Sequence, residues 1–182
     1  MGCVIVLGAP GVGKSTVLKG LEGKIRIMNY GDAMFSIAQK QGVKNRDDMR
    51  KLPVKSQEEI QEKAAKELAK TSERFVLDTH CSIKTPNGFL PGLPYRILQL
   101  LKVEALVLIE APAEEILSRR ANDPTRTRDE EEREALGEHL NANRSFLYAY
   151  SALCGSPAKI VVNRGGKVEE AQEELKRIVG VQ

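Results

Sequence analysis

The fold of this chain is restricted most by a glycine-rich segment near its start. Residues 8–15 read GAPGVGKS and match every position of the pattern G-x-x-x-x-G-K-[ST], and the apolar run CVIVL at 3–7 stands directly before them. Glycines let successive backbone N–H groups converge on a phosphate, since a Cβ would obstruct that close approach. A strand, this loop and a following helix point a helix N-terminus at the phosphate. The segment predicts binding of a nucleoside triphosphate.

Two side chains of this segment are expected to act on the phosphates directly. Lys14 would reach the β- and γ-phosphates, and the Ser15 hydroxyl would coordinate Mg²⁺. The alternative is a glycine-rich turn that binds nothing. The apolar run before the loop and the helix-forming residues 17–19 after it disfavour that alternative.

Composition limits the broad class of protein. The 182 residues, 41% of them hydrophobic, fit one domain that spans 1–182. The 28 basic and 25 acidic residues are interspersed and leave a net charge of only +3, so nucleic acid is not an expected partner. The three cysteines are widely spaced and show no metal-ligand pattern, which is typical of reduced thiols in the cytosol. No apolar stretch is long enough to span a membrane, and we expect a cytoplasmic location.

Short apolar runs alternate with longer amphipathic ones, which predicts an α/β fold. We expect a three-layer P-loop fold, in which helices cover a five-stranded parallel sheet. The predicted strands lie at 3–7, 24–28, 74–78, 104–110 and 158–162. The predicted helices lie at 14–21, 31–41, 56–71, 94–101, 113–121, 130–153 and 167–179. The Gly- and Pro-rich residues 85–94 read as an ordered loop at the sheet edge.

Asp78 is the second candidate for phosphate chemistry. It follows the buried strand FVL at 75–77, and the carboxyl ends of parallel strands meet at the edge that carries the phosphate loop. A carboxylate there is a natural partner for Mg²⁺. The alternative is that Asp78 only caps the following turn, and the two roles are compatible.

Four arginines at 119, 120, 126 and 128 form the third candidate. A phosphoryl group in transfer carries charge on its equatorial oxygens, which several guanidinium groups can neutralise from different sides. The alternative is a solvated basic face paired with the acidic residues 129–132. Only five residues separate the second and third of these arginines, and none is a cysteine, so we expect a short arginine loop without structural zinc.

The signals for a second substrate are weaker. In the segment NYGD at 29–32, Gly31 permits close approach and the aspartate after it can cap a helix. Arg46 and Arg50 would lie on one helical face, where both can hold a phosphate. The alternative is an exposed face balanced by the aspartates at 47–48. In the long helix at 130–153, Asn143 and Arg144 can also face the nucleotides.

Several blocks of this sequence recur together, and in this order, in one known family. They are GAPGVGKST at 8–16, NYGD at 29–32, RDDMRKLP at 46–53, DTHCSIKTP at 78–86, LPGLP at 90–94, LIEA at 108–111, the four arginines, and NANR at 141–144. In these blocks the chain resembles nucleoside monophosphate kinases, and most closely the archaeal type of adenylate kinase. The resemblance covers nearly the whole chain.

The resemblance implies reversible transfer of the ATP γ-phosphate to AMP, which gives two molecules of ADP. It also implies Mg²⁺ as the required ion, a homotrimer, an AMP-binding insertion at about 30–72 and a short lid at about 120–130.

The resemblance implies site residues as well. The residues around the ATP phosphates would be Gly8, Ala9, Pro10, Gly11, Val12, Gly13, Lys14, Ser15 and Thr16, and those that close over the transferring group would be Arg120, Arg126 and Arg128. The AMP side would comprise Tyr30, Gly31, Asp32, Met34, Arg46, Arg50, Thr79, His80 and Lys84. We expect His80 to position substrate, with a structural hydrogen bond as the alternative. The residues Asn163 and Arg164, in the loop after the last strand, are expected beside the adenine ring.

Other functions share the phosphate loop. A regulatory GTPase would need an Asn-Lys-x-Asp run and an Asp-x-x-Gly switch, and the sequence supplies neither after its strands. Two alternatives stay open: a kinase for another nucleoside monophosphate or for a small acceptor such as shikimate, and an adenylate-kinase-like ATPase that assists assembly.

Overall fold

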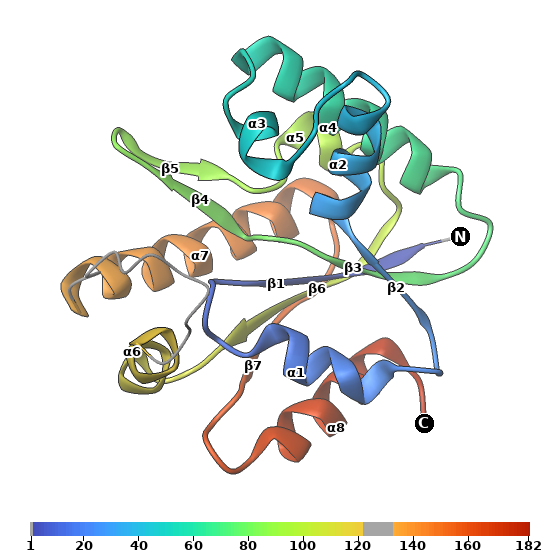
Figure 1. Cartoon of the computed structure of the whole chain (residues 1–182). Coiled ribbons are helices and arrows are strands. Elements are labelled where there is room, and N and C mark those ends of the chain that lie inside the picture. The colour runs from blue at the N-terminus through green and yellow to red at the C-terminus, as the bar shows by residue number, and fades with distance from the viewer. Residues whose placement is uncertain (1, 122–132) are drawn as a thin grey trace.

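A five-stranded parallel sheet forms the centre of the computed structural model, which describes residues 2–121 and 133–182, without the side chains of residues 120 and 121. The strand order is β2-β3-β1-β6-β7 (Figure 1). The strands are β1 (Cys3–Gly8), β2 (Arg26–Asn29), β3 (Phe75–Asp78), β6 (Val103–Glu110) and β7 (Ala158–Val162). All neighbouring pairs in this sheet are parallel, which confirms the predicted fold class.

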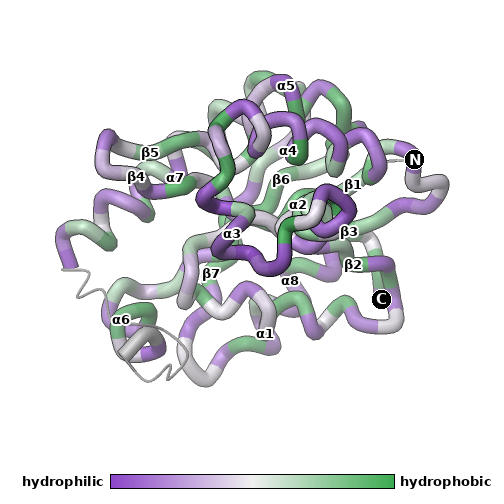
Figure 2. The backbone as a smooth tube through the Cα atoms, turned by 45° about the horizontal axis from the view of Figure 1, so that its top comes forward, coloured by the Kyte–Doolittle hydropathy of each residue, from purple (hydrophilic) through white to green (hydrophobic). Residues whose placement is uncertain are grey.

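The central strand β1 is buried on both faces, as its unbroken apolar sequence predicts. Cys3, Ile5 and Leu7 point into one core, and Val4 and Val6 point into the other. The helices α4 (Val54–Ala69), α5 (Tyr95–Leu98) and α7 (Arg133–Cys154) pack on the first face, and α1 (Lys14–Leu18) and α8 (Val168–Val179) pack on the second (Figure 1). Figure 2 shows hydrophobic strands in the interior and hydrophilic segments gathered around α3 (Arg46–Arg50) at the surface.

Seven of the described helices follow the predicted ones in order, and α3 is an additional helix. The described helices are α1 (Lys14–Leu18), which continues as the 3₁₀ turn Lys19–Leu21, α2 (Tyr30–Gln39), α3 (Arg46–Arg50), α4 (Val54–Ala69), α5 (Tyr95–Leu98), α6 (Ala113–Ala121), α7 (Arg133–Cys154) and α8 (Val168–Val179). The short α3 holds the two arginines that were expected on one helical face. Within the described residues, no helix is long and apolar enough to cross a membrane.

The prediction of an ordered loop at 85–94 was wrong. The strands β4 (Ser82–Thr85) and β5 (Gly88–Pro91) form an antiparallel hairpin instead. Its turn depends on Gly88, whose φ of 113° lies in the region that favours glycine. The Thr85 hydroxyl donates to the Gly88 carbonyl at 2.9 Å and closes the turn. Strands of four residues with mixed polarity carry too little alternation to be recognised in the sequence.

Candidate active site

The glycine-rich loop connects β1 to α1 at the carboxyl edge of the sheet, as predicted. Gly11 and Gly13 have φ of 94° and 81°, a region that side-chain-bearing residues rarely adopt. A Cβ at Gly8 would lie 3.0 Å from a Val12 methyl and 3.1 Å from the Ile109 carbonyl oxygen. The glycines are therefore required by the path of this loop and by its contact with β6.

The carbonyl of Val12 fixes the orientation of the loop. It accepts hydrogen bonds from Asn163 Nδ2 at 2.9 Å and from Arg119 Nη1 at 3.3 Å. In a trans peptide the C=O and the following N–H point in opposite directions. Holding the Val12 oxygen against Asn163 and Arg119 therefore turns the Gly13 N–H to the other side of that peptide.

This arrangement changes the expectation for Asn163. Its side chain is only 4% exposed, and a Cβ on Gly13 would collide with its Nδ2 atom. The side chain supports the phosphate loop, so it is not available to read an adenine ring. Arg164 is exposed beside it, and an adenine contact by this residue or by the loop backbone stays a prediction.

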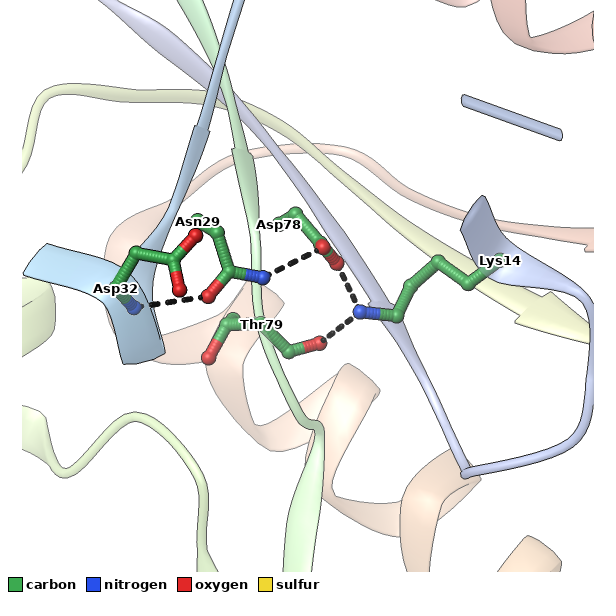
Figure 3. A network of polar contacts seen from close by, with 5 residues as sticks. All are labelled: Lys14, Asn29, Asp32, Asp78 and Thr79. Atoms are coloured by element: carbon green, nitrogen blue, oxygen red, sulfur yellow. Dashed lines mark hydrogen bonds and ion pairs between the residues drawn. The ribbon is translucent and has the colours of Figure 1, made fainter. Parts of the chain in front are cut away.

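A polar network joins the phosphate loop to the start of α2 (Figure 3). Lys14 Nζ pairs with Asp78 Oδ1 and also donates to the Thr79 carbonyl at 3.1 Å. The other carboxylate oxygen of Asp78 accepts from Asn29 Nδ2 at 2.8 Å. Asn29 Oδ1 accepts from the backbone N–H of Asp32 at 3.0 Å, so Asn29 caps α2, and the expectation that Asp32 does so was wrong.

Ser15 and Asp78 fit a magnesium ion by their chemistry. Both offer oxygen, which this hard cation prefers, and Mg²⁺ commonly takes only one or two protein ligands and fills its other positions with phosphate oxygens and water. Ser15 is exposed in the first turn of α1, and the Asp78 side chain is 14% exposed at the end of β3. Among the described residues, no group of three or more His, Cys, Asp or Glu could hold a metal alone.

The residues expected on the AMP side differ in how the fold holds them. Arg46 pairs with Asp32 and lies over the Phe35 ring, 5.7 Å from its centroid. Arg50 pairs instead with Asp47 at 3.0 Å, and both of these side chains are about three-quarters exposed. The structure therefore ties Arg46 to the start of α2 and leaves Arg50 exposed beside Asp47, near enough to His80 for its charge to lower the pKa of that ring. Contact of either arginine with a phosphate stays a prediction.

The other residues expected on the AMP side range from buried to exposed. Tyr30 is buried, and its hydroxyl donates to the Gln61 carbonyl at 2.9 Å. Met34 is partly buried against the core, Thr79 is buried, and Lys84 is exposed on β4. Their contacts with a nucleotide stay predictions.

His80 follows Thr79 at the same sheet edge. The residue is exposed at the surface, but the protein atoms around its ring reduce the ring's hydration and lower its pKa below the usual value, and the nearby Lys14 ammonium lowers the pKa further. Its neighbour Cys81 is buried, which raises the pKa of that thiol to about 12. A thiol held protonated in this way is not a nucleophile for the reaction.

An ion pair between the buried Glu110 and the half-exposed Arg144 was not recognised in the sequence. Glu110, at the end of β6, is 5% exposed and accepts two hydrogen bonds from Arg144, each of 2.7 Å. These bonds raise the pKa of Arg144. Asn143 is buried and accepts from the Ser82 hydroxyl at 2.6 Å, so its side chain is turned to the fold. Arg144 binds Glu110 but stays half exposed, and its contact with a nucleotide stays a prediction. The missed signal was a carboxylate at the end of an apolar strand, the same signal that identified Asp78.

The arginine loop is only partly described. Arg119 pairs with Glu115 at 2.6 Å and contacts the phosphate loop as stated above. The Arg120 side chain and residues Arg126 and Arg128 lie outside the described part of the chain.

Comparisons with known proteins agree with this geometry. A family model described as an AAA domain matches residues 7–137. An adenylate kinase of Thermoplasma acidophilum is 46% identical over 180 residues, which cover 97% of this chain and 98% of that protein. An adenylate kinase of Methanothermobacter thermautotrophicus is 44% identical over 184 residues, which cover 98% of this chain and 100% of that protein.

Solved structures support the fold independently. A shikimate kinase from Acinetobacter baumannii, solved in complex with shikimate, matches with a TM-score of 0.63 over 99% of this chain and 94% of its own. Its sequence is only 19% identical, so it indicates the fold alone. The two relatives above carry the assignment to a family: the chain belongs to the archaeal-type adenylate kinases.

Proposed function

We propose that the chain catalyses the reversible, Mg²⁺-dependent transfer of the γ-phosphate of ATP to AMP, which gives two ADP. One observation carries the proposal beyond family membership. The phosphate-loop Lys14, the strand-end Asp78 and the start of α2 meet in one hydrogen-bonded network. A donor and an acceptor held at adjoining positions of one sheet edge suit direct transfer between two bound nucleotides.

The donor half of the proposed site is built from the phosphate loop. Its backbone N–H groups and Lys14 would hold the ATP phosphates, and Ser15 and Asp78 would hold Mg²⁺. When bound, the ion would neutralise charge on the β- and γ-phosphates. Lys14 must leave Asp78 to reach the phosphates, and the flexible four-carbon stem of lysine allows this movement.

The acceptor half needs positioning more than proton transfer. An AMP phosphate already carries an anionic oxygen near neutral pH, so no general base is required, and His80 is proposed to position substrate. Arg46, held beside the start of α2, is the best-placed cation for that phosphate. Arg120, Arg126 and Arg128 are proposed to close over the transferring group.

A single assay tests the acceptor. ADP formation from ATP is followed by a coupled enzyme with AMP, CMP, UMP, GMP or shikimate as acceptor. We expect AMP to give the highest kcat/KM. A far higher kcat/KM with another acceptor would overturn the AMP assignment, and ATP hydrolysis that proceeds equally without AMP would favour the ATPase alternative.

Further proposals concern assembly and location. We propose a cytoplasmic homotrimer of single-domain chains, with the AMP-binding insertion at about 30–72 and the lid at about 120–130. Light scattering coupled to size-exclusion chromatography tests the assembly, and a mass of one chain would contradict it.

A further inference from the structure

Asn29 occupies a place that connects the two halves of the site. It is the last residue of β2, it lies opposite Asp78 in the β2–β3 register, and it caps α2. Its two polar atoms act in different directions: Nδ2 donates to Asp78, and Oδ1 accepts from the Asp32 N–H. Figure 3 shows this amide between the two aspartates.

We propose that Asn29 is a positioning residue that couples the ATP side of the site to the first turn of α2. The inference rests on the proposed function for the identity of the two ligands. Its physical basis is that one planar amide fixes both an oxygen of the Asp78 carboxylate and the backbone at the start of the acceptor helix. A movement of the Asp78 carboxylate is therefore transmitted to α2 through the Asn29 side chain alone.

The chemistry of an amide suits this position. Asp78 loses its contact with Lys14 when that lysine turns to the phosphates, whereas the Asn29 bond is compatible with both arrangements. A neutral donor holds the carboxylate and leaves its negative charge available to a cation, whereas a lysine or arginine at position 29 would compete with that cation. An aspartate at 29 would still cap α2 but would repel Asp78.

The coupling continues beyond the first turn. Asp32, whose N–H is bound by Asn29, pairs through its side chain with Arg46, the proposed phosphate ligand of the acceptor. Each link is a described contact, so the path from Lys14 to Arg46 runs through Asp78, Asn29 and Asp32. Asn29 is the link that can be changed without removing a charge.

The chain offers a matched control for this test. Asn45 caps α3 in the same manner, accepting from the Asp48 N–H at 2.8 Å, but it has no contact with Asp78. Serine caps helices nearly as well as asparagine, but it is too short to keep the bond from position 29 to Asp78. Asn29→Ser thus removes the bridge and keeps the cap, and Asn45→Ser controls for the substitution itself.

Hydrogen–deuterium exchange of residues 30–34 is the first measurement, with and without a non-hydrolysable β,γ-imido ATP analogue and Mg²⁺. We expect the analogue to slow exchange in this segment at least about fivefold in the wild type and in Asn45→Ser, and to leave it unchanged in Asn29→Ser. Equal slowing in Asn29→Ser, or no slowing in the wild type, would overturn the inference. Asn29→Asp, which keeps a cap acceptor, replaces Asn29→Ser if the serine variant does not fold.

Calorimetric titration of AMP is the second measurement, made with and without the same analogue. We expect the analogue to change AMP affinity about fivefold or more in the wild type and in Asn45→Ser, and less than about twofold in Asn29→Ser. Unaltered coupling in Asn29→Ser would contradict the bridge. A wild type that binds no AMP would overturn the proposed function instead, and the exchange measurement, which needs no AMP, would still decide the inference.

Discussion

The ATP side and the AMP side of the proposed site are held by different kinds of contact. On the ATP side the loop is fixed by its own backbone, by glycine conformations and by the buried Asn163. On the AMP side Arg46 and Arg50 depend on exposed ion pairs, and such pairs contribute only about 0–1 kcal/mol each. Folding therefore shapes the donor site in advance, whereas the acceptor site keeps side chains that a ligand can rearrange at little cost.

The largest effect that tests this difference is expected at Lys14. Lys14→Met removes the ammonium that would stabilise charge on the transferring phosphoryl group, so kcat should fall about 10²- to 10³-fold. The coupled assay measures this, with Lys19→Met, an exposed position in the 3₁₀ turn that follows α1, as the control. Retention of more than a tenth of wild-type kcat in Lys14→Met would mean that the loop does not position the phosphate as proposed.

The second effect concerns the stability of the sheet edge that carries the phosphate loop. Arg144→Met leaves the buried Glu110 carboxylate without its two hydrogen bonds, and we expect a loss of about 2–3 kcal/mol in the free energy of unfolding. Urea denaturation measures the loss. Adding Glu110→Gln to Arg144→Met should recover part of it, because the uncompensated charge is then absent. A double variant less stable than Arg144→Met would contradict this account.

The third effect separates the two arginines of α3. Arg46→Ala removes the cation tied to the start of α2 and should raise the KM for AMP about tenfold, the effect of one lost charge-assisted contact. Arg50→Ala removes an exposed partner of Asp47, and its KM should change less than about threefold. Both variants should unfold within about 0.5 kcal/mol of the wild type. Equal increases in KM would show that both arginines contact the substrate.

The contrast between the two sides also explains what could be predicted from the sequence. The phosphate loop, Asp78 and the parallel sheet follow from local patterns: glycine spacing, apolar runs and a carboxylate at a strand end. Asn163 could not be placed in this way, since it is 151 positions from Val12, and its partner is a backbone carbonyl that any residue would supply. Glu110 and Arg144 are 34 positions apart, and neither position alone indicates the pair.

The acceptor side was harder to predict for a second reason. Arg46 and Arg50 are equivalent in the sequence, four residues apart on one short helix, and only the position of Asp32 and Phe35 in space distinguishes them. Asn29 was part of a recognised block, yet its double role depends on the register between β2 and β3. Contacts between side chains distant in sequence depend on the exact strand register and helix placement, which local patterns in a single sequence do not reveal.

The smallest effect is expected at His80, where the two sides meet. Its pKa is lowered in the folded chain, first because nearby protein atoms reduce the hydration of its ring and then by Lys14, while Asp78 acts in the opposite direction. The unfolded chain, with a histidine pKa of about 6.5, then binds the proton more readily. The contribution of His80 to stability is therefore fully present above about pH 6.5 and is lost as the pH falls through the folded pKa. His80→Gln should lose less stability than the wild type between pH 7.5 and pH 5 in urea denaturation, and an NMR titration midpoint of the His80 ring above 6.5 would contradict the lowered pKa.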